Sequence, residues 1–113
     1  MKVISWNIRG LGNLAKNLAV RDIIKQESPS IVFLQETKLE EVEIMKATGN
    51  FWRDSLGSSQ SSRGASRGLG IFWLNKKLTL VDEIKTKSWI MALLEDKVTG
   101  ERIPFINIYG PVL

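Results

Sequence analysis

The sequence predicts an α/β fold, a layered α+β domain in which a mixed sheet is flanked by two helices. Its first half alternates strand-like and helix-like segments, whereas its second half holds strand-like segments with no helix between them. The chain has 113 residues, of which 43% are hydrophobic and 25% charged, so it can bury one two-layer core and is not a disordered chain. We therefore expect one domain over residues 1–113.

The first two strands and the first helix follow from local sequence patterns. A short β-type run covers residues 3–6, and the continuous apolar run 31–34 suits an interior strand buried on both faces. Between them, Asn13 is a good N-cap for a helix that runs to about Gln26, before the break at Ser28-Pro29. Apolar residues four positions apart predict that this helix buries a broad face. They are Leu14, Leu18, Ala19, Val20, Ile23 and Ile24.

A second helix is expected shortly after the second strand. Thr37 followed by Glu40 matches a capping box, in which each side chain satisfies a backbone N–H of the other residue, so the helix should begin after Thr37. Helically spaced apolar residues continue the pattern, and Gly49 is expected to stop it. These apolar residues are Leu39, Val42 and Met45.

The second half predicts strands and turns. The expected strands cover residues 51–54, 69–74, 78–83, 89–95 and 102–109. Residues 97–100 read as a hairpin turn, with Gly100 free to adopt a positive φ. The serine- and glycine-rich segment 55–70 is expected to be a loop, either a tolerated surface insertion or a phosphate contact through Arg63 and Arg67. The last strand has no following segment to cover its edge, so we expect a partial domain that lacks its C-terminal side.

The absent residue types exclude several catalytic chemistries. The chain has no cysteine and no histidine, which excludes disulfides, thiol nucleophiles, Ser–His pairs and imidazole or thiolate metal ligands. Carboxylate, amide, hydroxyl and phenol groups remain, and oxygen ligands of this kind favour a hard ion such as Mg²⁺. The net charge of +4 fits a polyanionic partner without demonstrating one. No apolar run is long enough to cross a membrane and no secretory signal is present, so we expect an intracellular protein.

Three polar residues stand at the ends of apolar strand-like runs. Glu36 follows the most apolar run, Asn7 follows the first run, and Tyr109 ends the last one. Because neighbouring strand ends can converge on one rim of a sheet, we expect the three side chains around one shared pocket. There the carboxylate suits a divalent cation, the amide can orient a ligand, and the phenol can donate to a phosphate. The alternative is a solvated Glu36 at the N-terminus of the second helix, a turn-forming Asn7 and a half-buried Tyr109.

A different interpretation rests on the glycines. Residues 10–15 match the G-x-G-x-x-G/A pattern between a strand and a helix, and Glu36 lies near the place of the ribose-binding acid in a dinucleotide-binding fold. However, residues 7–9 separate the strand from the first glycine, and the later strands are hairpin-like. The pattern therefore fits that fold less well than the shared pocket fits a phosphate ester.

Three motifs occur in the order found in the endonuclease/exonuclease/phosphatase superfamily, which includes deoxyribonuclease I and the apurinic endonucleases. They are Ser5-Trp6-Asn7-Ile8-Arg9-Gly10, Gln35-Glu36-Thr37-Lys38 and Asn107-Ile108-Tyr109-Gly110-Pro111. Together with residues 68–73, they make the chain resemble the endonuclease domain of plant LINE-type non-LTR retrotransposons. The resemblance implies the N-terminal portion of a four-layer α/β sandwich, in which two packed mixed sheets are flanked by helices.

The resemblance also implies a hydrolase of phosphodiesters or phosphomonoesters that uses Mg²⁺, or Mn²⁺ in its place. The interpretation as an endonuclease implies a phosphodiesterase that acts on DNA. In such an enzyme Glu36 is the principal metal ligand, Asn7 helps to position the metal or the phosphate, and Tyr109 hydrogen-bonds the scissile phosphate. The cations expected to hold the DNA backbone without regard to sequence are Arg9, Lys38, Arg63 and Arg67. An intracellular location that includes the nucleus fits such a substrate.

The sequence departs from the family after the tyrosine motif. Family members carry a Gly-Asp-x-Asn element and a late Asp-His pair, and neither occurs in this chain. We therefore expect a remnant or fragment of a magnesium nuclease with little or no activity by itself, whose partner is the missing C-terminal half of the domain. A non-catalytic basic module that binds nucleic acid is the alternative.

Overall fold

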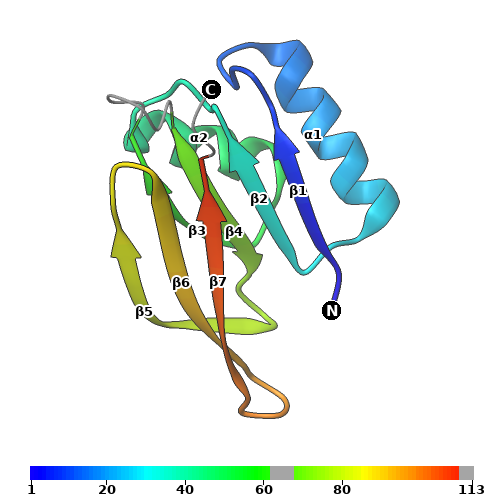
Figure 1. Cartoon of the computed structure of the whole chain (residues 1–113). Coiled ribbons are helices and arrows are strands. Elements are labelled where there is room, and N and C mark those ends of the chain that lie inside the picture. The colour runs from blue at the N-terminus through cyan, green and yellow to red at the C-terminus, as the bar shows by residue number, and fades with distance from the viewer. Residues whose placement is uncertain (62–67, 110–113) are drawn as a thin grey trace.

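The computed structural model describes residues 1–61 and 68–109, which form two sheets and two helices (Figure 1). In chain order the elements are β1 (Val3–Asn7), α1 (Leu14–Glu27), β2 (Ile31–Gln35), α2 (Glu41–Phe51), β3 (Ser55–Gln60), β4 (Leu69–Leu74), β5 (Leu78–Lys85), β6 (Trp89–Asp96) and β7 (Arg102–Ile108). The predicted α/β fold, with its early helices and later strands, is confirmed. Neither helix in this part of the chain is long and apolar enough to cross a membrane.

The strands form one mixed sheet and one antiparallel sheet. The first sheet has the order β1-β2-β4-β3, in which β1 is parallel to β2 and the other pairs are antiparallel. The second sheet is the antiparallel meander β5-β6-β7. Within the described residues, β1 is therefore one edge of the first sheet and β7 is one edge of the second.

The two sheets pack face to face, and the helices cover the other face of the first sheet (Figure 1). The core between helices and sheet consists of Ile8, Leu11, Val20, Ile24, Val32, Leu34, Ile44, Phe51, Trp52 and Phe72. The core between the sheets consists of Ile31, Leu69, Ile71, Trp73, Leu78, Ile90, Ala92 and Leu94. Strand β2 contributes to both cores, which explains why its residues form the unbroken apolar run seen in the sequence.

Helix α1 begins as predicted but buries less of its surface. The Asn13 side chain caps it by accepting a hydrogen bond from the Lys16 backbone N–H at 2.8 Å. The exposed fraction is 74% for Leu14 and 37% for Leu18, so the predicted broad buried face is wrong. The reason is its position: α1 lies beside β1 at the margin of the sheet, and only one stripe of it reaches the core (Figure 1). The buried residues on that stripe are Val20 and Ile24.

Helix α2 does not begin where the sequence predicted. Its N-cap is Glu40, and the capping box joins Glu40 to Glu43 rather than to Thr37. Thr37 is instead fully buried in the turn after β2, where its backbone N–H donates to the Gly68 carbonyl at 3.2 Å. The tertiary contact with the residue before β4 therefore overrides the local capping signal.

Residues 49–54 form the end of α2 and a turn, not a helix stop followed by a strand. Gly49 is helical, and the helix ends at Phe51. The ring of Phe51 meets that of Phe72 edge to face, with the ring centroids 6.4 Å apart. This core packing outweighs the helix propensity of glycine, which is unfavourable by only about 1 kcal/mol relative to alanine.

Strand β3 falls within the serine- and glycine-rich segment that the sequence assigned to a loop. Gly57 and Gly70 face the ring of Phe72, and a Cβ at either position would meet a ring carbon at 2.4 Å. These positions therefore require glycine because the Phe72 ring fills the space of a side chain. Composition alone cannot distinguish this use of glycine from a flexible loop. Residues 62–67 of the same segment lie outside the described residues.

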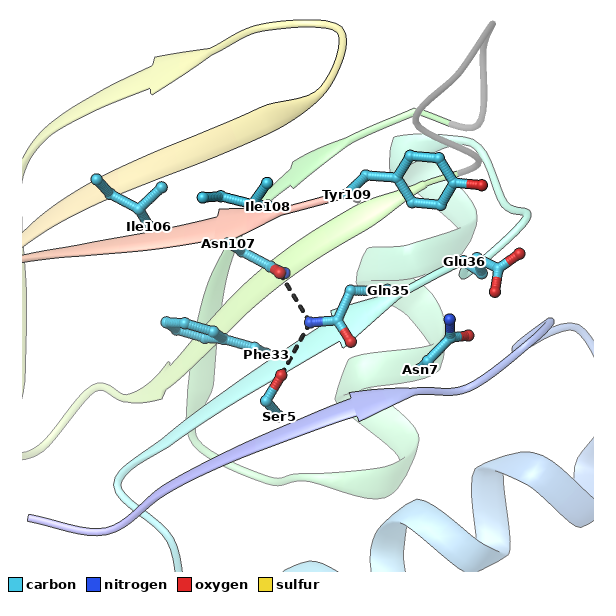
Figure 2. A pocket seen from close by; sticks show the side chains of 9 residues that line it. All are labelled: Ser5, Asn7, Phe33, Gln35, Glu36, Ile106, Asn107, Ile108 and Tyr109. Atoms are coloured by element: carbon cyan, nitrogen blue, oxygen red, sulfur yellow. Dashed lines mark hydrogen bonds between the residues drawn. The ribbon is translucent and has the colours of Figure 1, made fainter. Parts of the chain in front are cut away.

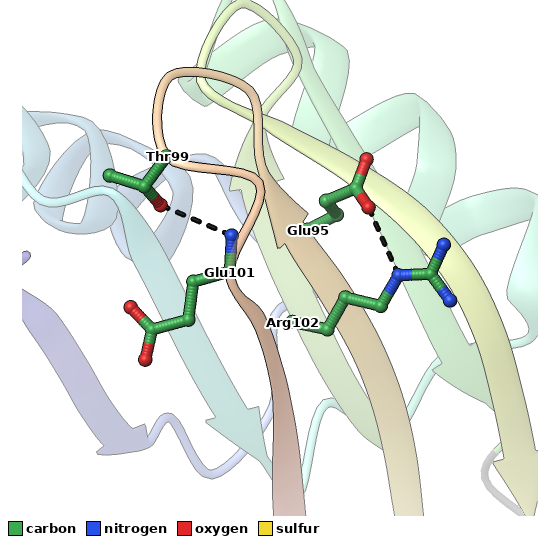
Figure 3. Close-up of polar contacts among 4 residues, drawn as sticks. All are labelled: Glu95, Thr99, Glu101 and Arg102. Carbon is green, nitrogen blue, oxygen red and sulfur yellow. Dashed lines mark hydrogen bonds and ion pairs between the residues drawn. The ribbon is translucent and has the colours of Figure 1, made fainter.

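The turn between β6 and β7 forms as predicted. Gly100 has a φ of 74°, and the Asp96 side chain accepts hydrogen bonds from two backbone N–H groups of the turn. Figure 3 shows the ion pair that follows the turn, in which Arg102 Nε lies 3.0 Å from Glu95 Oε1. This hairpin holds β7 against β6 and so determines where the end of β7 lies.

Candidate functional site

Asn7 and Glu36 lie side by side because β1 and β2 are parallel and end at the same edge of the sheet. Asn7 pairs with Gln35 in the β1–β2 ladder, and Glu36 follows directly. The pairing continues past the strands, since the Ile8 N–H donates to the Gln35 carbonyl at 3.0 Å and the Gly10 N–H to the Glu36 carbonyl at 2.7 Å. The two loops that leave the strands are thus held together.

The backbone at this edge is strained. Arg9, Glu36 and Lys38 have φ values of 52°, 53° and 57°, and a non-glycine residue in this left-handed region costs on the order of 1 kcal/mol. Gly68, with a φ of 91°, passes so close to Thr37 that a Cβ would lie 2.0 Å from the Thr37 Oγ1. Close packing and backbone hydrogen bonds impose these conformations. They also fix the direction in which Glu36 leaves the sheet.

Tyr109 reaches the same edge from the second sheet. It directly follows β7, and its backbone N–H donates to the Ser88 carbonyl at 2.8 Å. Its half-buried ring packs against the core between the sheets. Figure 2 shows Tyr109, Glu36 and Asn7 around one end of the same pocket. All three residues therefore line one pocket, which is the arrangement expected from the sequence.

The pocket is an open cleft between the two sheets, with a volume of about 530 Å³. A water molecule takes up roughly 30 Å³ in the liquid, so the cleft has room for an ion together with its hydration shell. The walls combine apolar side chains with amide, hydroxyl, phenol and carboxylate groups. The lining residues are Ser5, Asn7, Phe33, Gln35, Glu36, Ile106, Asn107, Ile108 and Tyr109.

Two amide side chains that the sequence analysis did not single out join the sheets beneath this cleft. Gln35 Nε2 donates to Ser5 Oγ at 3.0 Å and to Asn107 Oδ1 at 2.8 Å (Figure 2). Asn107 is buried, and its Nδ2 donates to the carbonyls of Leu34 at 3.0 Å and Gly70 at 2.9 Å. The available sequence signal was an asparagine inside an otherwise apolar strand, because a buried amide must find hydrogen-bond partners.

The predicted DNA-contacting cations fall into two groups. Arg9 and Lys38 are exposed in the loops that follow β1 and β2, two residues after Asn7 and Glu36. The Lys38 side chain lies over the first loop, since a Cβ at Gly10 would be 3.7 Å from its Cδ. Arg63 and Arg67 lie outside the described residues.

The donor set of the cleft fits a hydrated hard cation. The described residues contain no group of three or more acidic, histidine or cysteine side chains that could enclose a metal ion. Glu36 supplies a carboxylate, and neighbouring amides supply neutral oxygens. Mg²⁺ is commonly bound through one or two carboxylates together with water and substrate phosphate oxygens. The cleft therefore suits such an ion and does not suit one ligated by protein alone.

The glycine-rich turn is not arranged as in a dinucleotide-binding fold. At the N-terminus of α1, the Asn13 side chain accepts a hydrogen bond from the Lys16 backbone N–H. Lys16 Nζ donates to the Ile8 carbonyl at 2.6 Å. The strand next to β2 is the antiparallel β4, so the sheet contains a single parallel pair in the described part of the chain. A doubly wound dinucleotide-binding sheet consists mainly of parallel strands.

Sequence comparison identifies the family of this chain. The model of the Endonuclease/Exonuclease/phosphatase family matches residues 4–106. The chain belongs to this family. The matched range includes Asn7 and Glu36 and ends shortly before Tyr109. A search of curated proteins finds no match.

Solved structures with the same fold extend well beyond the length of this family member. The human Nocturnin catalytic domain with bound sulfate has a TM-score of 0.66 at 17% identity, covering 92% of this chain and 48% of that one. D. rerio TDP2 complexed with a single-strand DNA product has a TM-score of 0.65 at 21% identity, covering 92% and 43%. The AP endonuclease LMAP from Leishmania major has a TM-score of 0.67 at 22% identity, covering 95% and 39%. At these identities the similarity establishes the fold, and the chain spans less than half of each structure.

Proposed function

We propose that this chain contributes the N-terminal part of the active site of a magnesium-dependent phosphodiesterase that cuts DNA. The observation that carries the proposal is the cleft in which Asn7, Glu36 and Tyr109 meet. The DNA product in the TDP2 structure and the AP endonuclease identity of LMAP support DNA as the substrate. Manganese is the expected substitute for magnesium, because both ions accept oxygen ligands.

Each of the three residues has a distinct task in this proposal. The Glu36 carboxylate holds the ion, and Asn7, whose amide both donates and accepts, positions a metal ligand or a phosphate oxygen. The Tyr109 hydroxyl donates to the scissile phosphate. When bound, the ion neutralises the phosphate and stabilises the leaving oxygen.

The exposed cations beside the cleft have a binding task rather than a chemical one. Arg9 and Lys38 contact backbone phosphates without reading the bases, and Arg63 and Arg67 are proposed to do the same. Such contacts release counterions, so the affinity for DNA should fall steeply with salt concentration. A nuclear or other intracellular location is proposed to match the substrate.

We further propose that polypeptide equivalent to the second half of the longer family structures completes this site. The chain covers only 39% to 48% of the three structures described above. Without groups for activating water and transferring protons, hydrolysis loses orders of magnitude in rate, so these residues alone should have little or no activity. The motif around Tyr109 leads us to propose an origin in a LINE-type retrotransposon endonuclease.

The test measures binding of the chain to a fluorescent DNA duplex with and without Mg²⁺. Mg²⁺ should raise the affinity severalfold for the unmodified chain but not for Glu36→Gln, because the ion links that carboxylate to a phosphate. Glu101→Gln makes the same charge change at the exposed β6–β7 turn and should behave like the unmodified chain. A Mg²⁺ effect of equal size in both variants would contradict the proposal. Robust plasmid nicking by the chain alone, abolished by EDTA, would instead show that no second half is needed.

A non-catalytic module that binds nucleic acid is the second candidate. The exposure of Arg9 and Lys38 on adjacent loops favours it, since neither is engaged in a described ion pair. Under this alternative, Arg9→Gln and Lys38→Gln weaken binding in high and low Mg²⁺ alike, and Glu36→Gln has no Mg²⁺-specific effect. The same duplex-binding experiment therefore separates the two candidates.

A further inference from the structure

The orientation of the Gln35 carboxamide is determined by its neighbours. Asn107 Nδ2 uses both of its N–H bonds, on the Leu34 carbonyl at 3.0 Å and the Gly70 carbonyl at 2.9 Å, so its Oδ1 must accept. Gln35 Nε2 donates to that oxygen at 2.8 Å and to Ser5 Oγ at 3.0 Å. Exchanging the nitrogen and oxygen of Gln35 would set two acceptor oxygens against each other. The hydrogen-bond network therefore allows a single orientation.

Because both N–H bonds of Gln35 are engaged, its Oε1 is turned the other way. Figure 2 shows this oxygen on the side of the pocket where Asn7 and Glu36 lie. The bonds of Gln35 to described residues all run through its nitrogen. The cleft thus presents a fixed acceptor oxygen in the same pocket as the Glu36 carboxylate.

An acceptor at this position selects its ligand by charge and hydrogen-bonding type. A phosphate oxygen is itself an acceptor and is repelled by a carbonyl oxygen, whereas water bound to a divalent cation is a strong donor. The cleft holds too few carboxylates to replace the water shell of an ion, so the ion keeps several waters that need acceptors. Groups that hold such waters commonly change metal affinity by 10- to 100-fold, as an order of magnitude.

We propose that Gln35 is a positioning residue whose Oε1 accepts a hydrogen bond from water bound to the ion that Glu36 holds. The inference rests on the metal site of the proposed function but not on DNA cleavage. The hydrogen bond between Gln35 and Asn107 then has two effects: it joins the two sheets, and it orients Gln35 Oε1 toward the ion.

The experiment measures Mn²⁺ affinity of the 113-residue chain from the EPR signal of free Mn²⁺, for Gln35→Leu and Gln35→Glu. Both variants remove the donor bonds to Asn107 and Ser5, and Gln35→Glu in addition sets a carboxylate oxygen against Asn107 Oδ1, so it damages the network at least as much. Only Gln35→Leu removes the acceptor. Gln35→Leu should weaken Mn²⁺ binding about tenfold. Gln35→Glu should strengthen it, because it adds a second carboxylate beside Glu36. A purely structural Gln35 would make both variants weaker, and that result would overturn the inference.

Two controls separate the possible failures. Ser58→Ala breaks another hydrogen bond between the sheets, from Ser58 Oγ to Glu83 Oε2 at 2.6 Å, and should leave Mn²⁺ affinity unchanged. Cobalt(III) hexaammine, whose ligands do not exchange, should compete with Mn²⁺ and bind about tenfold more weakly to Gln35→Leu. An unchanged hexaammine affinity in that variant would mean that Gln35 coordinates the ion directly, and would overturn the water-mediated contact.

The Mn²⁺ affinity of Glu36→Gln separates failure of this inference from failure of the proposed metal site. If Glu36→Gln abolishes Mn²⁺ binding but Gln35→Leu does not weaken it, only the inference about Gln35 fails. If Mn²⁺ binding does not depend on Glu36, the proposed metal site fails as well.

Discussion

Asn107 shows how one buried amide can position a whole cleft. Its side chain is 1% exposed, and it makes hydrogen bonds to three residues of the first sheet: Leu34, Gln35 and Gly70. It also stands two residues before Tyr109, so the same contact that joins the sheets sets the end of β7 beside β2. The cleft therefore depends on a buried side chain whose amide joins the two sheets.

Replacing this amide should destabilise the protein more than replacing an equally buried hydroxyl. Asn107→Leu removes the amide that bonds two carbonyls and one N–H of Gln35, which should lower the free energy of unfolding by about 2–4 kcal/mol. Thr48→Val is the matched control, because Thr48 is 2% exposed and its hydroxyl bonds only within its own helix, to the Ile44 carbonyl. That change should cost less than about 1 kcal/mol. Urea unfolding of both variants gives the comparison, and similar losses would argue against a special place for Asn107.

The candidate residues differ in how far the sequence could reveal them. The meeting of Asn7, Glu36 and Tyr109 in one cleft was predictable because each ends an apolar run, and strand ends of a layered sheet can converge. The orientation of Gln35 was not predictable, because it depends on Asn107, 72 residues further along the chain. The local sequence predicts where each strand ends, whereas tertiary contacts determine which polar groups face the cleft.

At the scale of elements, local signals predicted the fold except where a tertiary contact competed with them. β4 occupies the predicted residues 69–74, and Asn13 caps α1 as expected. The predicted start of α2 was wrong because Thr37 is buried against Gly68, and β3 was missed because its glycine accommodates the Phe72 ring. Both errors involve small or polar residues whose use depends on a neighbour distant in sequence.

Two glycine substitutions test the corrected elements and should have opposite signs. Gly49→Ala should stabilise the protein by about 0.5–1 kcal/mol, because the position is helical and a Cβ there meets nothing within 4 Å. Gly57→Ala should destabilise it by about 1–3 kcal/mol, because the new Cβ would lie 2.4 Å from the Phe72 ring. Thermal unfolding followed by circular dichroism provides the measurement. If Gly49 ended the helix in a left-handed conformation, as the sequence suggested, Gly49→Ala would instead lower the stability.

At the scale of the whole molecule, one end of the outer face of the second sheet is apolar and exposed. Ile84 pairs with Met91, and Met91 pairs with Ile106, so the three side chains lie in one row on the same face. The exposed fraction is 46% for Ile84, 50% for Ile106 and 62% for Ile108, and the last two also border the cleft. An apolar face of this kind is typical of a surface that contacts other polypeptide.

This face should bind a hydrophobic dye. The double variant Ile106→Thr, Ile108→Thr should lower the fluorescence of bound ANS severalfold, because threonine keeps the β-propensity and removes apolar surface. Val98→Thr is the matched control, since Val98 is 91% exposed but stands alone in the β6–β7 turn. Equal ANS fluorescence in the double variant and the unmodified chain would show that the face is not an apolar binding surface.

The proposed active site requires one ion site shared by strands from both sheets. Tyr109 is the only tyrosine in the sequence, so its ring signals in a proton NMR spectrum are assigned without ambiguity. Substoichiometric Mn²⁺ should broaden these signals selectively, because a paramagnetic ion held by Glu36 lies in the cleft that Tyr109 lines. Glu36→Gln should abolish the broadening. Two results would contradict an ion held by Glu36 in this cleft. In the first, the Tyr109 signals stay sharp in the unmodified chain while signals of other residues broaden; in the second, they broaden equally in Glu36→Gln.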